Sequence, residues 1–447
     1  MSSTDRQNRL LLSEDWKRVY QSFRNADFQS YDFDNLRRTM IQYLRDNYPE
    51  DYNDYVDSSE YLALIDLIAY LGQNIAFRID LNARENYMEL AERRESVLRL
   101  ARLLSYNPKR NQAANGLVKL DSIKTTEQVI DSNGNNLQEQ TIVWNDVSNP
   151  DWYEQFIKVM NTGLPSNSEF GKPNKKELIS GISTEQYRFN SINSDIATYQ
   201  YNKIIDGRNL SFEIVSTDVT STSIEEEAPF PGNKFALIYK DDGKGVASNS
   251  TGFFSHFRQG SLDQGVFTIN NPSSNQSIAV EAPDINDTDV WLYKLDSEGN
   301  EQELWSKVDA LQGNNVVYNS LSKSERNIYS ALTRVDDRVT LVFSDGVFGN
   351  LPQGTFRVYF RSSQNERIVL TPKDFSNILV SIPYISKSGK TEELTLLYSL
   401  YYTVDNGATS ESTDTIRFNA PSTYYTQNRM VTGEDYQVAP LGINQKI

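Results

Sequence analysis

The N-terminal 110 residues place apolar side chains at the three- and four-residue spacing of amphipathic helices. The stretches SEDWKRVYQSFR (13–24) and DNLRRTMIQYLRDNYP (34–49) each carry one apolar stripe. The stretch SSEYLALIDLIAYLGQNIAFRID (58–80) carries two adjacent stripes and only a narrow polar line. A helix that is apolar nearly all round is buried on several sides. We therefore expect this helix to have several neighbours, either within its own chain or in a multi-chain bundle, and the two can both hold.

The two stripes of this helix supply the candidate interface residues. Leu62, Ile65 and Ala69 belong to the first stripe, and Ile68 and Ile75 belong to the second. A charged helix, expected from about Arg84 to Ser105, turns Tyr87, Leu90, Ala91, Val97, Leu98, Ala101 and Leu104 inward. Because that helix can cover only one side, we predict that the other stripe meets another chain.

The texture changes after Ala114, where short alternating runs are separated by turn residues. Strands are predicted at GLVKLDSI, LSFEIVSTDV, KFALIYKD, SIAVEAP and DVWLYKLDS, and around 339–343 and 356–360. Helices are predicted at TEELTLLYSLYYTV (391–404), at TDTIRFNAP (413–421) and from Thr432, where TGED has a capping-box pattern. The expected fold class is α+β and multidomain. Its expected parts are a helical segment (1–112), a β-rich middle of one or two subdomains (113–335) and a mixed α/β region (336–447).

Composition narrows the function. The 447 residues carry a formal net charge of −16, which disfavours nucleic acid and anionic membranes as partners. There is no cysteine, and we see neither an apolar run approaching 18 residues nor a signal peptide. We expect a soluble chain that is made in a cytosol and binds no membrane.

Candidate catalytic and metal sites are few. One histidine, His256, lies between aromatic residues, so zinc sites with two histidines are excluded and a packed or surface histidine is favoured. The glycine-rich stretch SDGVFGNLPQG lacks the lysine of a phosphate-binding loop and returns to a strand, so we interpret it as a turn. The acidic stretches DSNGNN, DDGKG and DSEGN do not fit the EF-hand spacing and are interpreted as hairpin turns. We predict no catalytic, cofactor-binding or metal-binding residue.

Three blocks in order resemble one family. The stretch LIDLIAYLGQNIAFRIDLNARENYMELAERRESVLRLARLLSYNP resembles the N-terminal helices of baseplate J-like proteins, with Glu85, Arg94 and Tyr106 at matching places and Ser105 where glycine is commoner. FSDGVFGNLPQGT is similar to a second family block, through Gly346, Gly349 and Pro352. NAPSTYYTQNRMVTGEDY is similar to a third, through Pro421, Arg429, Thr432 and Asp435. The blocks cover about a quarter of the chain.

The resemblance implies an inner baseplate wedge protein of T-even-like contractile-tailed phages. It implies a structural part of the virion without catalysis or cofactor, made in the cytoplasm of the host bacterium. Expected partners are a second copy, a longer wedge partner chain, a small lysozyme-fold wedge protein, and hub and sheath neighbours. The matching residues are expected to be structural: Pro421 ends one helix, Thr432 caps the next, and Arg429 pairs with a carboxylate or carbonyl. Larger members continue beyond the third block, so a domain used for ring contacts is expected to be missing or to lie outside this sequence.

An alternative function comes from the 26 tyrosines, which could stack on sugars. A carbohydrate-binding or carbohydrate-cleaving tail component, such as a receptor-binding protein, would expose clustered aromatic residues on one β face. A wedge subunit would instead expose apolar helix surface.

Overall fold

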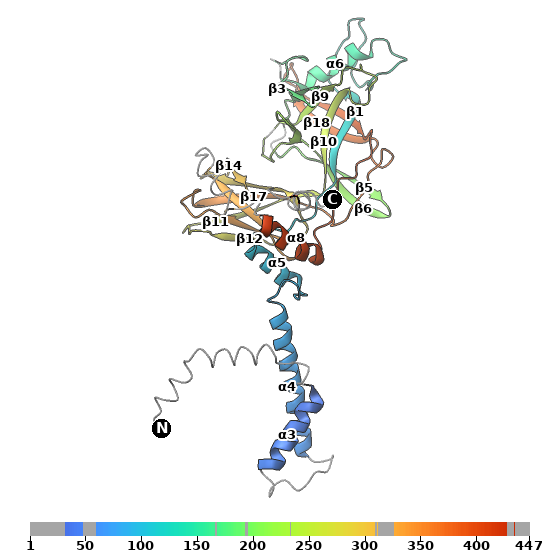
Figure 1. The fold of residues 1–447 in the computed structure, drawn as a ribbon. Coiled ribbons are helices and arrows are strands. Elements are labelled where there is room, and N and C mark those ends of the chain that lie inside the picture. Colours follow the sequence, from blue (N-terminus) through green and yellow to red (C-terminus); the bar gives the residue numbers. More distant parts are fainter. Residues whose placement is uncertain are drawn as a thin grey trace. The chain divides into compact units, whose positions relative to one another are not determined.

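The computed structural model describes residues 32–47, 60–165, 168–192, 195–232, 234–308, 311, 326–426 and 433. The chain forms two compact units, Met1–Leu100 and Ala101–Ile447. The first is helical, and the second contains β-sheets and a C-terminal helix, with all elements labelled as in Figure 1. The expected α+β, multidomain class is therefore confirmed. The helix predicted at 13–24 and the one predicted from Thr432 lie outside the described residues, except for position 433.

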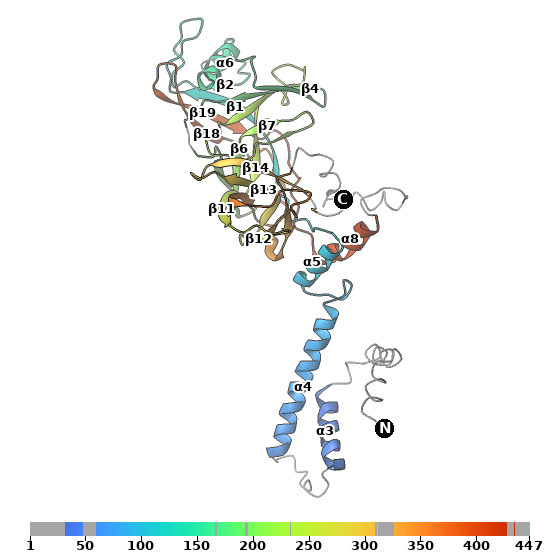
Figure 2. The same ribbon diagram turned by 90° about the vertical axis from the view of Figure 1, so that its left-hand side faces the viewer.

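Two predicted helices of the first unit are confirmed as α3 (Phe33–Asn47) and α4 (Glu60–Arg84). They lie side by side (Figures 1 and 2). Leu36 of α3 packs over Gly72 of α4, where an added Cβ atom would stand 3.1 Å from the leucine Cδ1 atom. Arg37 and Asp66 form an ion pair between the two helices, with a distance of 2.6 Å. Both contacts fix which face of α4 turns toward α3.

The single helix expected from Arg84 to Ser105 is wrong. Helix α4 ends at Arg84, and α5 spans Arg94–Leu103. The carboxylate of Glu85 causes the break, because it accepts the N–H groups of Glu92 and Arg93 at 3.1 and 3.2 Å, just where α5 begins. Tyr87 and Leu90, which were expected to face inward, lie in the turn and are exposed.

A ten-stranded sheet holds both ends of the β region in the second unit. Its strand order is β18-β19-β1-β10-β9-β4-β3, while β2 pairs with β1, and β6 pairs with β10 and β5. These neighbouring strands are all antiparallel. The bounds are β1 Asn115–Thr125, β2 Ile142–Val143, β3 Lys175–Ile179, β4 Ile182–Arg188, β5 Tyr199–Ile205, β6 Arg208–Val215, β9 Ala236–Asp241, β10 Gly252–Gln259, β18 Ile378–Ile385 and β19 Thr391–Ser399. A separate pair, β7 (Thr217–Val219) and β8 (Ile224–Glu226), lies between β6 and β9 in the chain.

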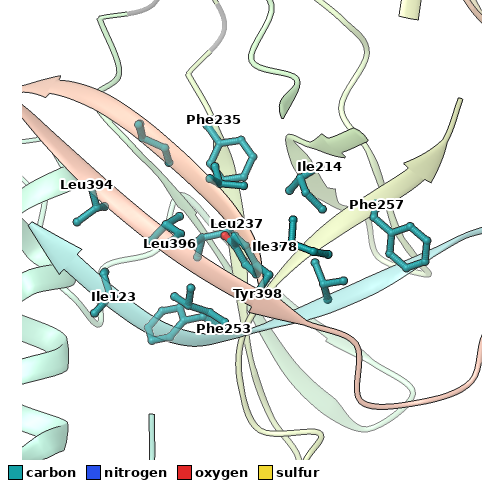
Figure 3. Packing of buried hydrophobic residues seen from close by; sticks show 14 of the residues in the cluster. Ile123, Ile214, Phe235, Leu237, Phe253, Phe257, Ile378, Leu394, Leu396 and Tyr398 are labelled. Carbon is teal, nitrogen blue, oxygen red and sulfur yellow. The ribbon is translucent and has the colours of Figure 1, made fainter. Parts of the chain in front are cut away.

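The core of this sheet is apolar and aromatic. Helix α6 (Trp152–Gly163) packs against β1 and β2 and buries Phe156, Val159 and Met160. Figure 3 shows side chains from distant parts of the chain in one cluster, including Ile123, Leu237, Phe253, Ile378 and Leu396. Burial of such side chains is the main stabilising term of the domain.

A seven-stranded sheet forms the second β layer and is built from one continuous stretch of chain. Its order is β11-β17-β13-β14-β15-β16-β12, with only β14 and β15 parallel. The bounds are β11 Ser261–Ile269, β12 Ser277–Val280, β13 Ile285–Leu295, β14 Glu301–Lys307, β15 Ile328–Thr333, β16 Val339–Phe343 and β17 Gly354–Ser362, and a short 3-10 helix at Val335–Asp337 precedes β16. The two sheets do not coincide with the two expected regions, 113–335 and 336–447, because each sheet contains strands from both regions. Strands of the later range pair with β1 in one sheet and with β11, β12, β13 and β15 in the other.

The helix predicted at 391–404 is wrong, because Thr391–Ser399 forms strand β19. Leu394, Leu396 and Tyr398 are fully buried at alternate positions, which is strand periodicity. The same sequence also places Leu394, Leu397 and Tyr401 at helical spacing. Pairing with β1 on one side and β18 on the other decides in favour of the strand. The strands predicted from the five alternating runs and around 339–343 and 356–360 are confirmed.

Helix α8 (Thr413–Thr426) confirms the helix predicted at TDTIRFNAP but is longer than expected. Pro421 lies inside it, so the expectation that Pro421 ends the helix is wrong. Proline lacks an N–H group and removes one backbone hydrogen bond. Ile416 and Ala420 are fully buried, and Ser422 donates to the carbonyl of Phe418 at 2.9 Å, so packing and a side-chain bond support the helix around the proline.

Candidate assembly interface

The five candidate interface residues divide between two faces of α4. Ile65 and Ala69 are buried, at 6% and 1% exposure, and Leu62 is half-buried on the same face. Ile68 and Ile75 are 52% and 59% exposed. The first stripe therefore serves the contact with α3, and the second stripe is open among the described residues.

The open face of α4 is large and apolar. Its exposed side chains are Leu64, Leu67, Ile68, Tyr70, Leu71, Ile75, Phe77 and Ile79. Isolated exposed apolar residues are normal, but a contiguous set along one helix marks an interaction surface. By length and composition alone, the segment Leu62–Arg84 would also be able to cross a membrane. An 18-residue stretch of it has a mean hydropathy of 1.4, and 11% of that stretch is buried. A helix buried inside a protein assembly meets the same two criteria.

Glu85 holds the turn between α4 and α5. It is buried, and its carboxylate accepts backbone N–H groups and a hydrogen bond from the Ser96 side chain. Burial raises the pKa of Glu85, but these hydrogen bonds outweigh it and lower the pKa overall. Arg94 begins α5 and is half-buried. The contacts of Glu85 thus fix the local structure at the start of α5.

Tyr106 and Ser105 stand where the chain enters the β-rich unit. Ser105 has φ of 59°, a conformation that glycine adopts without strain, which explains why glycine is the commoner residue in the resembling block. Tyr106 is buried, and its hydroxyl lies 2.7 Å from Oε1 of Glu411. Burial, together with the negative charge of Glu411, raises the pKa of Tyr106 well above its usual value.

The glycine-rich stretch from Asp345 to Gly354 connects β16 to β17. The carboxylate of Asp345 accepts the N–H groups of Val347 and Phe348 at 2.9 and 3.0 Å, so it closes the turn. Gly346 has φ of +87°, and Pro352 is buried. Gly349 does not have a positive φ, but an added Cβ atom would stand 2.8 Å from Ile328 Cγ1 and 2.8 Å from Ser344 Cβ. The interpretation as a structural turn holds for both glycines, for two different reasons.

Other candidate positions have plain structural surroundings. His256 is buried in β10, and burial together with Arg258 and Arg361 lowers its pKa to about 3. Asp296 occupies the hairpin turn between β13 and β14 and accepts N–H groups of Glu298 and Asn300. Arg429, Thr432 and Asp435 lie outside the described residues. Within the described residues, no group of three or more histidine, cysteine, aspartate or glutamate side chains is arranged to hold a metal ion.

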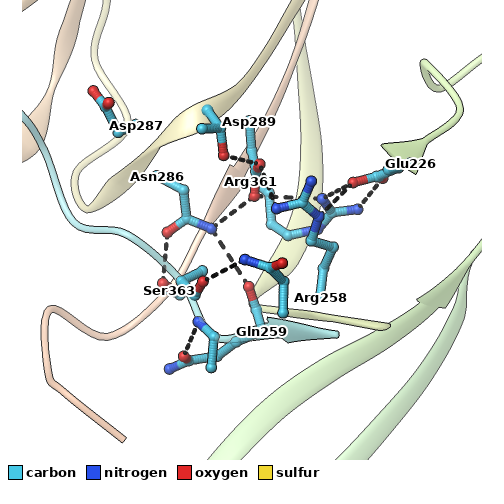
Figure 4. A network of polar contacts seen from close by, with 12 residues as sticks. Glu226, Arg258, Gln259, Asn286, Asp287, Asp289, Arg361 and Ser363 are labelled. Carbon is cyan, nitrogen blue, oxygen red and sulfur yellow. Dashed lines mark hydrogen bonds and ion pairs between the residues drawn. The ribbon is translucent and has the colours of Figure 1, made fainter. Parts of the chain in front are cut away.

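A buried ion cluster joins the two sheets and was not predicted. Arg361 of β17 is fully buried, with its Nε atom 2.8 Å from Glu213 of β6 and its Nη2 atom 2.7 Å from Glu226 of β8. Asp289 of β13 lies 3.5 Å from the same guanidinium and 3.8 Å from Arg258, as Figure 4 shows. Burial raises the pKa of Asp289, but Arg258 and Arg361, together with hydrogen bonds from Asn286 and Thr288, lower it overall. The sequence signal is weak: Glu213 stands between the apolar Phe212 and Ile214, and Arg361 follows Phe360 near the end of β17.

Two family models match the chain over different ranges. Residues 116–403 match a family described as a domain of unknown function (DUF8360). The chain belongs to this family. The matched range begins in β1 and ends just after β19, so it contains the strands of both the ten-stranded and the seven-stranded sheet.

Residues 32–103 match the N-terminal domain of a bacteriophage baseplate protein. This range contains α3, α4 and α5, and therefore the open face of α4. The match indicates a bacteriophage baseplate protein and supports a structural role in the phage tail. No curated protein matches the sequence.

Proposed function

We propose that this chain is an inner wedge subunit of a contractile phage tail baseplate, and that α4 joins it to neighbouring wedge chains. The observation that carries the proposal is the open apolar face of α4, which lies inside the range that matches a baseplate protein. The resemblance to baseplate J-like proteins supports the wedge position.

The spacing on the open face supports a helical partner. Leu64, Ile68, Leu71 and Ile75 follow one another by four, three and four residues, which is the seam of a coiled coil. Isoleucine then falls at the a positions and leucine at the d positions, a combination that favours two parallel strands. We propose that the same helix of a second copy packs along this seam.

A second exposed strip suggests a further helix. Leu67, Tyr70 and Phe77 are also exposed on α4 and lie outside the seam. Each large apolar side chain left in water forgoes roughly 1.5–3 kcal/mol of burial, so both strips need cover. We assign this second strip to a longer wedge partner chain. Contacts with a small lysozyme-fold wedge protein and with hub and sheath neighbours belong to the same proposal and rest on the resemblance alone.

The proposed subunit is a virion part without catalysis, made in the host bacterial cytoplasm, and it binds neither nucleic acid nor a membrane. The carbohydrate alternative has no specific observation in its favour. Among the described residues, the largest fully buried side chains include Tyr329, Tyr359, Tyr384 and Tyr398, so these tyrosines fill the interior of the sheets.

The test is the mass of the full-length protein in solution, alone and co-expressed with candidate wedge chains, measured by light scattering. Ile68→Asp and Ile75→Asp should abolish association while leaving the melting of the β-rich unit unchanged. Gln73→Asp is the matched control, because it adds the same charge at an exposed position on the polar line of α4. If the parent stays monomeric with every wedge chain, or if the seam variants assemble like the control, the proposal is wrong.

A further inference from the structure

A cavity of about 440 Å³ opens where the chain passes from one sheet to the other. Gly260 marks the fork: its N–H donates to the carbonyl of Ser211 in β6 at 2.8 Å, and the next residue begins β11. Gly260 has φ of +118°, and an added Cβ atom would stand 2.6 Å from the carbonyl oxygen of Ser362. The cavity therefore lies where the chain leaves the ten-stranded sheet and enters the seven-stranded one. Its walls come from β6, β11, β17 and the loop before β13.

The floor of the cavity is rigid. The side chain of Gln259 is buried and accepts the N–H of Ala114 at 3.0 Å, while its carbonyl accepts from Asn286 at 3.4 Å. Ser363 donates to the side-chain oxygen of Asn286 at 2.6 Å. Figure 4 shows these residues directly beside the buried ion cluster. A ligand would meet a floor that is already in place, which lowers the entropic cost of binding.

The lining is acidic and has unused hydrogen-bonding capacity. It includes Asp263 and Asp284 but no lysine, arginine or histidine. In the described part of the chain, the Asp284 carboxylate has no hydrogen-bond or ion-pair partner, and that of Asp263 accepts only the N–H of Gln264, at 2.7 Å. Burial and the nearby charge of Asp336 raise the pKa of Asp284. The amides of Asn209 and Gln364 add further acceptors to the lining.

Nearby basic residues of this chain are committed to other acids. Arg208, next to Asn209, pairs with Glu366. Arg334 and Arg338 both pair with Glu281, at 2.9 and 3.0 Å. None of these three arginines is paired with Asp263 or Asp284, and the whole chain is strongly acidic.

We propose that this cavity receives an arginine side chain from a neighbouring protein chain. A guanidinium has five N–H donors in a fixed plane, which suits several separated acceptors better than the compact ammonium of lysine. Leu210, Pro283 and Phe360 line the same cavity and cover the aliphatic stem. The site lies in the β-rich unit, and the inference does not depend on the role proposed for α4.

The test uses the full chain and two labelled peptides of identical sequence, acetyl-Gly-Thr-Val-Xaa-Val-Thr-Gly, in which Xaa is arginine or its neutral isostere citrulline. Fluorescence polarisation at low and at physiological ionic strength measures binding. The arginine peptide should bind at least about tenfold more tightly than the citrulline peptide. Equal binding of the two peptides, or no binding of the arginine peptide, overturns the proposal.

Protein variants locate the site. Asp284→Asn and Asp263→Asn should each weaken the arginine peptide severalfold and abolish its preference over citrulline. Both preserve shape, and asparagine tolerates the positive φ of Asp284, which is 52°. Glu298→Gln, which removes an exposed charge at the turn between β13 and β14, is the matched control and should change nothing. Unchanged binding in both aspartate variants overturns the assignment to this cavity.

Arginine amide is the second probe and distinguishes a protein partner from a small guanidinium compound. It should bind detectably by saturation-transfer NMR, and more weakly than the peptide. If it binds as tightly as the peptide, the occupant is a small molecule and the neighbouring chain is excluded. Thermal melting of each variant checks that the fold is retained.

Discussion

The hydroxyl of Tyr106 lies 2.7 and 2.9 Å from the two carboxylate oxygens of Glu411, although 305 positions separate the residues. Tyr106 follows α5, and Glu411 precedes α8. Both side chains are buried, so this bond ties the entrance of the β-rich unit to its last described helix. Because the carboxylate of Glu411 is buried, we expect this contact to be sensitive to pH.

Burial raises the pKa of Glu411 above its ordinary value of 4.5, and the hydrogen bond from Tyr106 only partly opposes this. The folded protein thus keeps this proton to a higher pH than the unfolded chain, and stability falls as pH rises above 4.5 through the folded pKa. Glu411→Gln removes the titration. Urea unfolding from acidic to neutral pH should show the parent losing stability relative to this variant, and two parallel curves would contradict the prediction.

The turn glycines give a second prediction. Gly346→Val forces a β-branched residue to positive φ and should cost on the order of 1–3 kcal/mol. Gly349→Val should also destabilise, by overlap with Ile328 and Ser344. Val347→Ala, at an exposed position of the same loop, is the control and should stay within about 0.5 kcal/mol. Denaturant unfolding measures all three, and calorimetry with nucleotide or calcium should show no binding that the glycine variants abolish.

The buried ion cluster around Arg361 gives a third prediction. Arg361→Met removes the cation that Glu213, Glu226 and Asp289 share, and leaves only Arg258 beside Glu226 and Asp289. It should cost about 3–5 kcal/mol, as for other broken buried pairs. Arg367→Met is the comparison, because Arg367 is largely exposed in its pair with Asp405 and should cost about 1 kcal/mol or less. Similar losses in the two variants would show that the cluster has no special role.

The acid limb of the stability curve reports on the same cluster. The pKa of Asp289 is depressed, so its contribution is present above its ordinary value of 3.8 and is lost as pH falls through the folded pKa. The parent should therefore lose stability on acidification more steeply than Arg361→Met does. Unfolding at a series of acidic pH values measures the difference in slope.

The two faces of α4 give a fourth prediction. Ile65→Asp buries a charge against α3 and should lower local stability by at least about 3 kcal/mol. Ile68→Asp, on the open face, should leave protection of α4 unchanged in the protomer. Because the chain has two units, unfolding is not two-state, so hydrogen exchange of residues 60–84 is the measurement. Equal protection in both variants would refute the division of the faces.

Local periodicity was enough to predict α3, α4 and most of the strands, because each of these elements presents one clear apolar pattern. It failed at β19, where the spacing of Leu394 and Leu397 fits a helix and only pairing with β1 selects the strand. It failed again at Glu85, whose carboxylate ends a helical pattern through backbone contacts seven and eight residues away.

For the candidate interface, the sequence predicted the two apolar stripes of α4 but not which of them α3 covers, and the reason is physical. The two stripes of α4 could be read from the sequence, but the stripe that α3 covers depends on Leu36 and Arg37, which lie on another element. The ion cluster and the cavity were invisible because Arg361 meets Glu213 only after two sheets have assembled, 148 positions apart. Nothing in the spacing of isolated charges encodes that meeting.

The order of the strands along the chain also determines when each sheet can complete its pairing during translation. All strands of the seven-stranded sheet leave the ribosome in one run, so that sheet can form as soon as β17 appears. Strand β1 is synthesised early, but its partner β19 follows much later. The first residue of β19, Thr391, lies 266 positions after Thr125, the last residue of β1. At about 5–20 residues per second, synthesis of the segment between β10 and β19 alone takes roughly 7–26 seconds. Throughout that interval one edge of β1 is unpaired in the nascent chain, which is where a co-translational chaperone would be needed most.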